Sequence, residues 1–155
     1  MEKEKLNSTI ILADATITHD YAFQLAQKIL RAGEKNIIIG LIGDLGSGKT
    51  TFAQGFANGL GIKKISSPTF VLMKVYPINT KNKSEFKRFA HIDAYRLAGK
   101  SDILESIGAT EYLKDNHTIT LIEWADIIKK KLPKNTLFIK LKYYDNHQKR
   151  TLKIA

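Results

Sequence analysis

The chain has 155 residues, of which 43% are hydrophobic and 26% charged, a balance typical of a soluble globular protein with a single domain over residues 1–155. It contains no cysteine, which excludes disulfides, thiolate metal sites and cysteine nucleophiles, and its four histidines show no metal-ligand spacing. No apolar run approaches the roughly 20 residues that span a bilayer, and no signal segment follows the charged start, so we expect a cytoplasmic protein.

The charge balance favours an anionic partner. There are 25 Lys and Arg residues against 15 Asp and Glu, a formal net charge of +10, which suits nucleotides, RNA or an acidic protein surface. The lysines are spread along the chain, however, as they are in proteins that are merely soluble. The local clusters at 81–88 and 129–131 hold a single aromatic residue, Phe86, and not the repeated aromatic residues on which successive bases stack. Composition therefore favours solubility over specific RNA binding.

The first elements in chain order are a short strand at 9–12 and a helix. We expect Thr18 to cap this helix, because apolar residues follow it at helical spacing until Gly33. The nearly continuous apolar run 36–42 predicts a strand buried on both faces of a parallel sheet. It leads into a glycine-rich segment, after which a helix should run over 49–60.

The middle of the chain predicts a hairpin. Residues 70–76 and 86–92 indicate strands, and their polar connection is too short for a helical crossover, so the pair should be antiparallel. Ser101 can then cap a short helix that carries Ile103 and Leu104.

The last third predicts a strand at 118–122, a helix over 124–131 and a terminal hairpin. The hairpin strands are 137–144 and 150–154, with a turn at 145–146. Strands of both directions alternating with helices indicate a three-layer α/β domain with a mixed, partly antiparallel sheet.

Residues 43–50 match the phosphate-loop pattern G-x-x-x-x-G-K-[ST] without a mismatch. The buried strand before this segment and the helix after it are the context that the pattern requires, so we expect a P-loop NTPase-like fold. Lys49 should reach the β- and γ-phosphates, and the Thr50 hydroxyl should bind magnesium. We expect the nucleotide to contact Asp44, Leu45, Gly46, Ser47, Gly48, Lys49, Thr50 and Thr51.

A phosphate loop also needs a carboxylate to complete the magnesium shell. Glu123 and Asp93 each close an apolar strand, and ligands bind at the carboxyl ends of strands in open α/β sheets. Alternatively, each acid caps the next helix or pairs with Arg96. The position of Glu123 favours a role in the magnesium site over capping or pairing. For Asp93 the position favours neither of these interpretations.

Residues 66–69, Ser-Ser-Pro-Thr, precede a strand and are rich in hydroxyl groups. Composition alone favours a plain turn here, although switch loops present hydroxyls to magnesium in the same way. Trp124 follows Glu123 directly, and a lone tryptophan belongs more often to a core or rim than to a partner surface.

In combination, these segments resemble the bacterial TsaE (YjeE) ATPases of tRNA threonylcarbamoyladenosine synthesis. The phosphate loop is generic, whereas the other three segments together are specific to the family and occur in its order and spacing. The matching segments are 43–52, 67–70 (SPTF), 91–97 (HIDAYRL) and 121–124 (LIEW).

The resemblance implies a weak ATPase that uses ATP and Mg²⁺ and works inside an assembly. Its partners in that family are TsaB and TsaD, and TsaD transfers the threonylcarbamoyl group to tRNA. ATP hydrolysis to ADP and phosphate is thought to reset this pair between turnovers. The tRNA is then reached through the partners, with direct contact left open.

The resemblance also implies roles for single residues. Lys49 and the loop amides hold the phosphates, while Thr50 and Glu123 hold magnesium. Asp93 either organises the attacking water or supports the magnesium shell from behind.

Other positions receive weaker assignments from the same resemblance. Thr69 belongs to the switch-like segment, and Trp124 supports the site or the partner surface. Arg150 contacts the nucleotide, and His19 lies near its base.

Two other functions fit the phosphate loop. A small kinase would need an acceptor pocket and usually an arginine-rich lid, whereas this chain holds only four arginines. A non-catalytic binding module would use ATP to order the switch segment, and hydrolysis would be incidental.

Overall fold

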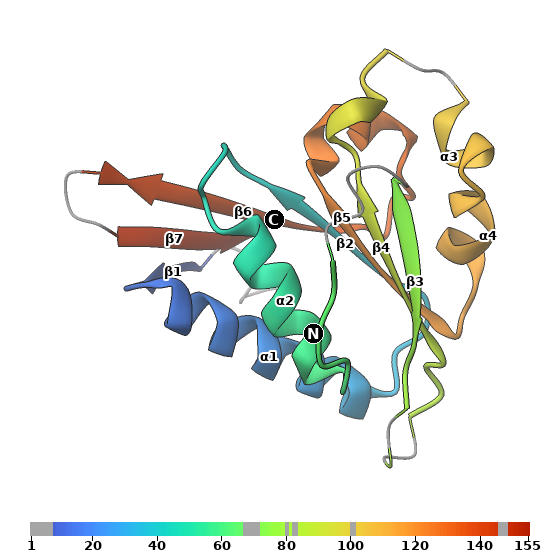
Figure 1. Cartoon of the computed structure of the whole chain (residues 1–155), viewed down its shortest axis with the longest axis horizontal. Helices are drawn as coiled ribbons and strands as arrows, with labels where there is room; N and C mark the ends of the chain where they lie inside the picture. The colour runs from blue at the N-terminus through green and yellow to red at the C-terminus, as the bar shows by residue number, and fades with distance from the viewer. Residues whose placement is uncertain (1–7, 67–71, 80, 82–83, 100–101, 146–148) are drawn as a thin grey trace.

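The computed structural model describes residues 8–66, 72–79, 81, 84–99, 102–145 and 149–155. Strands and helices alternate along this part of the chain (Figure 1). The strands are β1 (Thr9–Leu12), β2 (Ile37–Ile42), β3 (Met73–Pro77), β4 (Arg88–Asp93), β5 (Thr118–Glu123), β6 (Leu137–Tyr144) and β7 (Lys149–Ile154). The helices are α1 (Ala15–Ala32), α2 (Lys49–Gly59), α3 (Ile103–Ser106) and α4 (Ala109–Lys114), with the 3₁₀ segments η2 (Tyr95–Leu97) and η3 (Ala125–Lys131).

The strands form one mixed sheet in the order β1-β7-β6-β2-β5-β4-β3. β2 runs parallel to both β5 and β6, and β4 runs parallel to β5. The pairs β3–β4, β6–β7 and β1–β7 are antiparallel. The predicted α/β class, the mixed sheet and both hairpins are therefore confirmed.

Two apolar layers cover the sheet. On one side, α1 and α2 bury a cluster that includes Phe52, Phe56 and Leu41. On the other side, α3, α4 and η3 pack over a second cluster that includes Ile38 and Ile122. Since neighbouring residues of a strand point to opposite faces, the apolar run of β2 supplies both layers at once.

The helices α1 and α2 approach each other closely at Gly55. A β-carbon at this position would lie 2.2 Å from the carbonyl oxygen of His19 in α1. Gly59 makes a similar approach to the backbone of Phe23, one turn further along. Because glycine has no side chain, Gly55 and Gly59 allow the backbone of α1 to pack closely against α2, the helix that follows the phosphate loop.

Three local expectations need correction. The residue that caps α1 is Asp14, whose Oδ1 accepts from the amide of Ile17 at 2.9 Å, while Thr18 lies buried inside the helix. The predicted helix over 124–131 is a kinked 3₁₀ segment, η3. Helix α4 was not anticipated. Ser101 and part of the turn at 145–146 lie outside the described residues.

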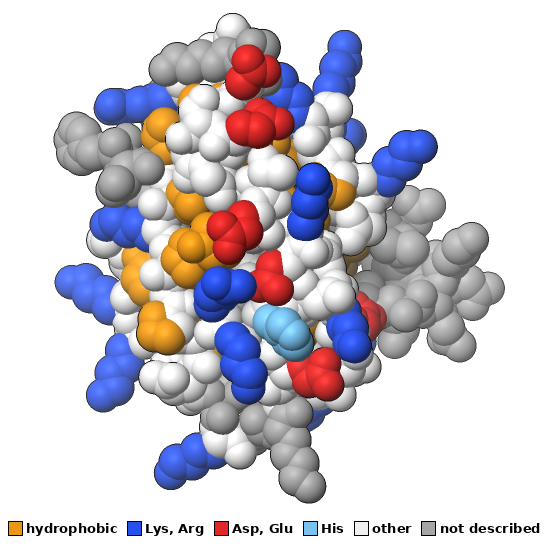
Figure 2. Space-filling model, turned by 90° about the vertical axis from the view of Figure 1, so that its right-hand side faces the viewer, with side chains coloured by type: hydrophobic (Ala, Val, Ile, Leu, Met, Phe, Trp, Pro, Cys, Tyr) orange, Lys and Arg blue, Asp and Glu red, His pale blue; other side chains and the backbone are white. Residues whose placement is uncertain are grey.

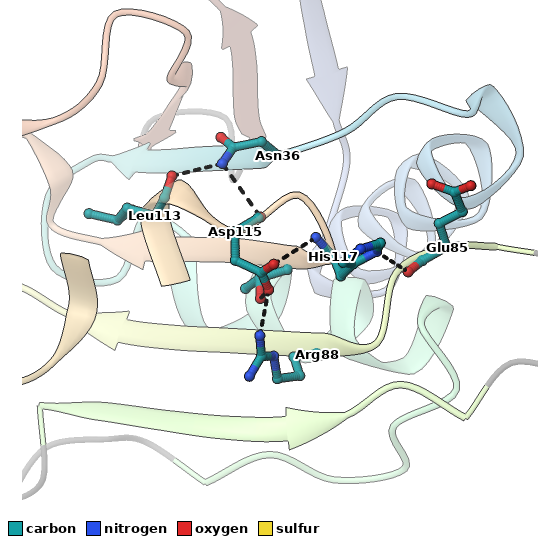
Figure 3. A network of polar contacts seen from close by, with 7 residues as sticks. Asn36, Glu85, Arg88, Leu113, Asp115 and His117 are labelled. Atoms are coloured by element: carbon teal, nitrogen blue, oxygen red, sulfur yellow. Dashed lines mark hydrogen bonds and ion pairs between the residues drawn. The ribbon is translucent and has the colours of Figure 1, made fainter. Parts of the chain in front are cut away.

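A polar network ties together the edge of the sheet at which β2, β4 and β5 begin (Figure 3). Asp115 accepts from the Arg88 guanidinium at 2.7 Å and from the Thr118 hydroxyl at 2.5 Å. The Asn36 amide donates to the carbonyl of Leu113 at 2.8 Å. The Thr118 hydrogen bond in particular lowers the pKa of Asp115 to about 2. This network aligns the strands whose opposite ends carry the candidate site.

Candidate functional site

The glycine loop lies at the carboxyl end of the central strand β2 and leads into α2. β5 is the parallel neighbour of β2, and Leu41 near the end of β2 pairs with Glu123 at the end of β5. Asp93 at the end of β4 pairs in turn with Glu123. The register of these three parallel strands therefore brings both predicted carboxylates to the edge that carries the loop.

The loop backbone takes a shape that glycine favours. Gly48 caps the start of α2 with a φ of +106°, a conformation that other residues rarely adopt. The Ser47 amide donates to the carbonyl of Asp44 at 3.1 Å, which closes the turn. The first amides of α2 have no intrahelical acceptor, so this end of the helix attracts an anion.

Lys49 is folded back onto the loop, with 6% of the residue exposed. Its ammonium group donates to the carbonyls of Gly43 and Asp44, the latter at 2.9 Å, and lies 3.8 Å from the centre of the Trp124 ring. Burial lowers the pKa of Lys49, while nearby carboxylates, Glu123 foremost, oppose this shift. Asp126, which sequence reasoning did not single out, is one of those carboxylates.

The Glu123 carboxyl is buried, which disfavours its charged form. Only 5% of the residue is exposed, and its Oε1 has no hydrogen-bond partner among the described residues. Burial, with the charge of Asp93, raises its pKa to about 7, against the opposing effects of Lys49 and the Thr50 hydroxyl. A buried carboxyl with a free oxygen beside a phosphate loop suits a cation ligand.

His91 lies two residues before Asp93 in β4, and the sequence motif alone assigns it no role. It is 2% exposed, and neither ring nitrogen has a hydrogen-bond partner among the described residues. Its Nε2 lies 3.9 Å from Oε2 of Glu123. Because burial lowers the pKa of His91 to about 4 while that of Glu123 is about 7, the two groups are not charged at the same pH. The contact is therefore not an ion pair.

Asp93 is only partly buried. Its Oδ1 accepts from the Tyr95 amide at 3.0 Å, so one of the two expected alternatives, capping of the next turn, does occur. The functional interpretation of this residue stays a prediction.

A cavity of about 280 Å³ lies over the loop. Arg150 of β7 reaches it from the far side, packs against Gly48, and places its guanidinium 5.4 Å from the centre of the Tyr143 ring. The Arg150 Nε is buried and has no hydrogen-bond partner among the described residues. The lining residues are Leu45, Gly46, Gly48, Lys49, Thr50, Thr51, Glu123, Trp124 and Arg150.

Asp44, Ser47 and Asp93 are expected site residues that do not line this cavity. Thr69 lies outside the described residues. The His19 imidazole hydrogen-bonds to Asn58 at 2.7 Å, which raises its pKa, and it does not line the cavity.

A larger hollow of about 1100 Å³ lies between α1 and the strand end at Ile10 and Ile154. Its described lining residues include Lys28 and Arg31 but no acid and no glycine loop. Size therefore does not locate the site, whereas the chemistry of the lining does.

The donor groups fit magnesium better than zinc or calcium. Among the described residues, no three His, Asp or Glu side chains gather as a metal cage. Magnesium is usually bound by one or two carboxylates together with substrate phosphates and water. Thr50 and Glu123, next to a phosphate loop, supply such a partial set.

The model of the family "Threonylcarbamoyl adenosine biosynthesis protein TsaE" matches residues 14–152. The chain belongs to the TsaE family. TsaE proteins are named for tRNA threonylcarbamoyladenosine biosynthesis, which agrees with the resemblance found in the motifs.

Individual proteins of this family are also similar to the chain. The chain is 34% identical to the TsaE protein of Rickettsia bellii over 148 residues, 94% of each chain. It is 42% identical to the TsaE protein of Bacillus subtilis, but the match spans 68% of this chain and 61% of that protein. The crystal structure of Bacillus subtilis YdiB superposes with a TM-score of 0.70 and 30% identity, covering 96% of this chain and 85% of YdiB.

No helix in the described part of the chain is long and apolar enough to cross a membrane. The longest, α1, alternates buried residues with exposed polar ones.

Proposed function

We propose that this chain binds ATP with Mg²⁺, hydrolyses it to ADP and phosphate, and thereby acts as the nucleotide switch of a tRNA-modifying assembly with TsaB-like and TsaD-like partners. One observation carries the proposal. The strand register brings Glu123 next to the loop that holds Lys49 and Thr50, and its buried Oε1 has no hydrogen-bond partner in the part of the chain that the structure describes. This is the arrangement that phosphate loops need for a nucleotide and its metal.

Lys49 moves when the nucleotide binds. In the structure its donors are taken up by the Gly43 and Asp44 carbonyls. A triphosphate offers fully charged acceptors, which bind an ammonium group more strongly than carbonyls do. Lys49 therefore leaves the carbonyls and the Trp124 ring and turns to the phosphates. Arg150, whose Nε has no hydrogen-bond partner among the residues that the structure describes, approaches from the opposite side of the cavity.

Thr50 and Glu123 would hold the metal, with Glu123 in its ionised form. When bound, magnesium neutralises phosphate charge and stabilises the charge that develops on the leaving group. Asp93 uses its second oxygen to orient the attacking water or to fix a ligand of the metal. Its hydrogen bond from the Tyr95 amide holds the carboxylate in place for either task.

The rim of the cavity suits a partner that senses the nucleotide. Trp124 touches Lys49 on one side and the Tyr95 ring on the other, with ring centroids 4.9 Å apart. Tyr95 is 60% exposed and Leu45 of the loop is 89% exposed. Departure of Lys49 from Trp124 thus alters the packing behind the exposed Tyr95 ring, which a bound TsaB-like or TsaD-like protein can detect.

Calorimetric titration with Mg·ATP and a phosphate-release assay test the site together. Asp93→Asn should keep ATP binding within a few-fold but reduce hydrolysis about 100-fold or more, since positioned acids contribute ~10²–10⁴ to such steps. Asp102→Asn, at the exposed residue before α3, is the matched control and should change neither. Equal hydrolysis by both variants would refute the assignment of Asp93. Absence of ATP binding by the unaltered chain would refute the proposed function itself.

The two alternative functions predict different results. With ATP that is labelled at its γ-phosphate, a kinase would transfer the label to an added acceptor, whereas this proposal predicts that the label appears as inorganic phosphate. A non-catalytic module would support tRNA modification equally well with a nonhydrolysable ATP analogue.

A further inference from the structure

One end of the sheet presents a face that no described helix covers. Along β6, Ile139 and Leu141 are buried against the core, while Lys140 and Lys142 alternate to the other side and are exposed. In Figure 1, β6 and β7 extend to the left, while α3 and α4 lie at the right. The face opposite α1 and α2 is therefore open along β6, β7 and β1.

The hairpin register gathers lysines that are distant in sequence. Lys153 of β7 lies directly opposite Lys140, and Lys149 lies opposite Tyr144. On a strand, residues two apart are about 6.8 Å from each other and point to the same face, so Lys140 and Lys142 are also neighbours along β6. We call this surface the lysine face. Its exposed side chains are Thr9, Ile11, Lys140, Lys142, Tyr144, Lys149 and Lys153, with Thr151 partly covered between them.

The lysine face carries no acid on its three strands, and its four lysines make no ion pair within the described residues. The surface around α3 and α4 differs, since Figure 2 shows Lys and Arg side chains interspersed with Asp and Glu there. Like charges directly opposite each other on a sheet are destabilising. The pair Lys140–Lys153 is therefore unfavourable unless an anion lies across it.

Protection of an exposed sheet edge does not explain this arrangement. Lysines that prevent edge-to-edge aggregation lie on the edge strand itself. Here β6 and β7 are interior strands, and the edge strand β1 instead exposes Ile11 at 64%. The lysines thus belong to the open face and not to the edge.

We propose that the lysine face binds RNA, with the four lysines on backbone phosphates and Tyr144 stacked on an unpaired base. Tyr144 is 47% exposed and lies on the same face, opposite Lys149 and two residues beyond Lys142. Flat sheet faces that combine cations with an aromatic ring bind single-stranded RNA in this manner. The family's pathway modifies tRNA, so tRNA is the RNA we assign. This contact goes beyond the nucleotide switch and does not depend on ATP hydrolysis.

Salt dependence of tRNA binding tests the phosphate contacts. Four neutralised phosphates give a slope of log K against log salt of roughly −3, so affinity falls about 50- to 150-fold between 50 and 200 mM salt. In the double variant Lys140→Glu/Lys153→Glu the slope should become shallower, by about 1.5 in magnitude. The matched control Lys87→Glu/Lys114→Glu changes the net charge equally at exposed positions elsewhere and should retain the original slope.

The probe is an unmodified tRNA transcript, measured without nucleotide by fluorescence anisotropy, with unfolding midpoints confirming that each variant folds. Tyr144→Ala should weaken binding about 5-fold or more, since stacking on one base contributes ~1–3 kcal/mol. Its control is Tyr143→Ala, a neighbour of similar exposure that points to the other face. Equal slopes for both double variants would overturn the proposal. A second result would also overturn it: the Lys140→Glu/Lys153→Glu variant loses binding to phosphatidylserine vesicles or to an acidic peptide but binds tRNA as the wild type does.

Discussion

Replacement of Glu123 by glutamine should stabilise the nucleotide-free protein at alkaline pH. Burial raises the pKa of this carboxyl from its ordinary 4.5 to about 7 in the folded state. Between these two values the folded chain keeps a proton that the unfolded chain has released, so stability falls as pH rises through this window. The difference of 2.5 units corresponds to about 3 kcal/mol.

Urea unfolding of the wild type and Glu123→Gln, with EDTA and without nucleotide, measures this difference. The two proteins should be nearly equal at pH 4.5, and at pH 8 the variant should be more stable by about 3 kcal/mol. Their difference removes the contribution of titratable groups that do not contact Glu123. His91 does contact Glu123, and its pKa of about 4 makes stability rise with pH between 4 and 6.5, so the difference at pH 8 carries the test.

Glu105→Gln is the control, since it neutralises an exposed acid on α3. A pH-independent difference between Glu123→Gln and the wild type would refute the reasoning, as would a variant that is less stable at pH 8. Mg·ATP binding should weaken in the same variant. Stability and function should thus change in opposite directions at this one residue.

Three further substitutions have definite outcomes. Lys49→Ala should weaken Mg·ATP binding in calorimetry by about 10- to 100-fold, since each hydrogen bond to a charged group contributes ~1.5–3 kcal/mol; unchanged affinity would contradict the role of Lys49. Gly55→Ala should lose about 1–3 kcal/mol in thermal unfolding despite alanine's higher helix propensity, because its β-carbon would meet the His19 carbonyl; a stabilised variant would contradict the packing. Asp115→Asn should destabilise the chain above pH 4, an effect that disappears as pH falls toward 2, and a pH-independent loss in urea unfolding would contradict it.

Much of the fold and the candidate site could be predicted from the sequence, because local patterns encode them. The strand before the loop, the carboxylates that close β4 and β5, and the short polar connections of both hairpins are each visible within a few residues. Parallel neighbours then necessarily bring Asp93 and Glu123 to one edge. The role of these residues in catalysis and metal binding stays a prediction.

Other features depend on contacts between distant segments. The burial of His91 beside Glu123 follows from packing on both sides of the sheet, and the motif alone does not reveal it. Lys140 and Lys153 meet only through the hairpin register, so a search for sequence clusters missed the lysine face. Thr18 was preferred as a cap because helical spacing becomes clear only after it, whereas Asp14 starts the helix one turn earlier.

The most direct test of the nucleotide switch is the number of threonylcarbamoyl groups that a reconstituted assembly adds to tRNA. The chain, its TsaB-like and TsaD-like partners and excess tRNA are combined either with ATP or with a nonhydrolysable analogue. We expect many modifications per assembly with ATP, and a halt near one per assembly with the analogue or with Asp93→Asn. Unrestricted turnover with the analogue would contradict a switch driven by hydrolysis.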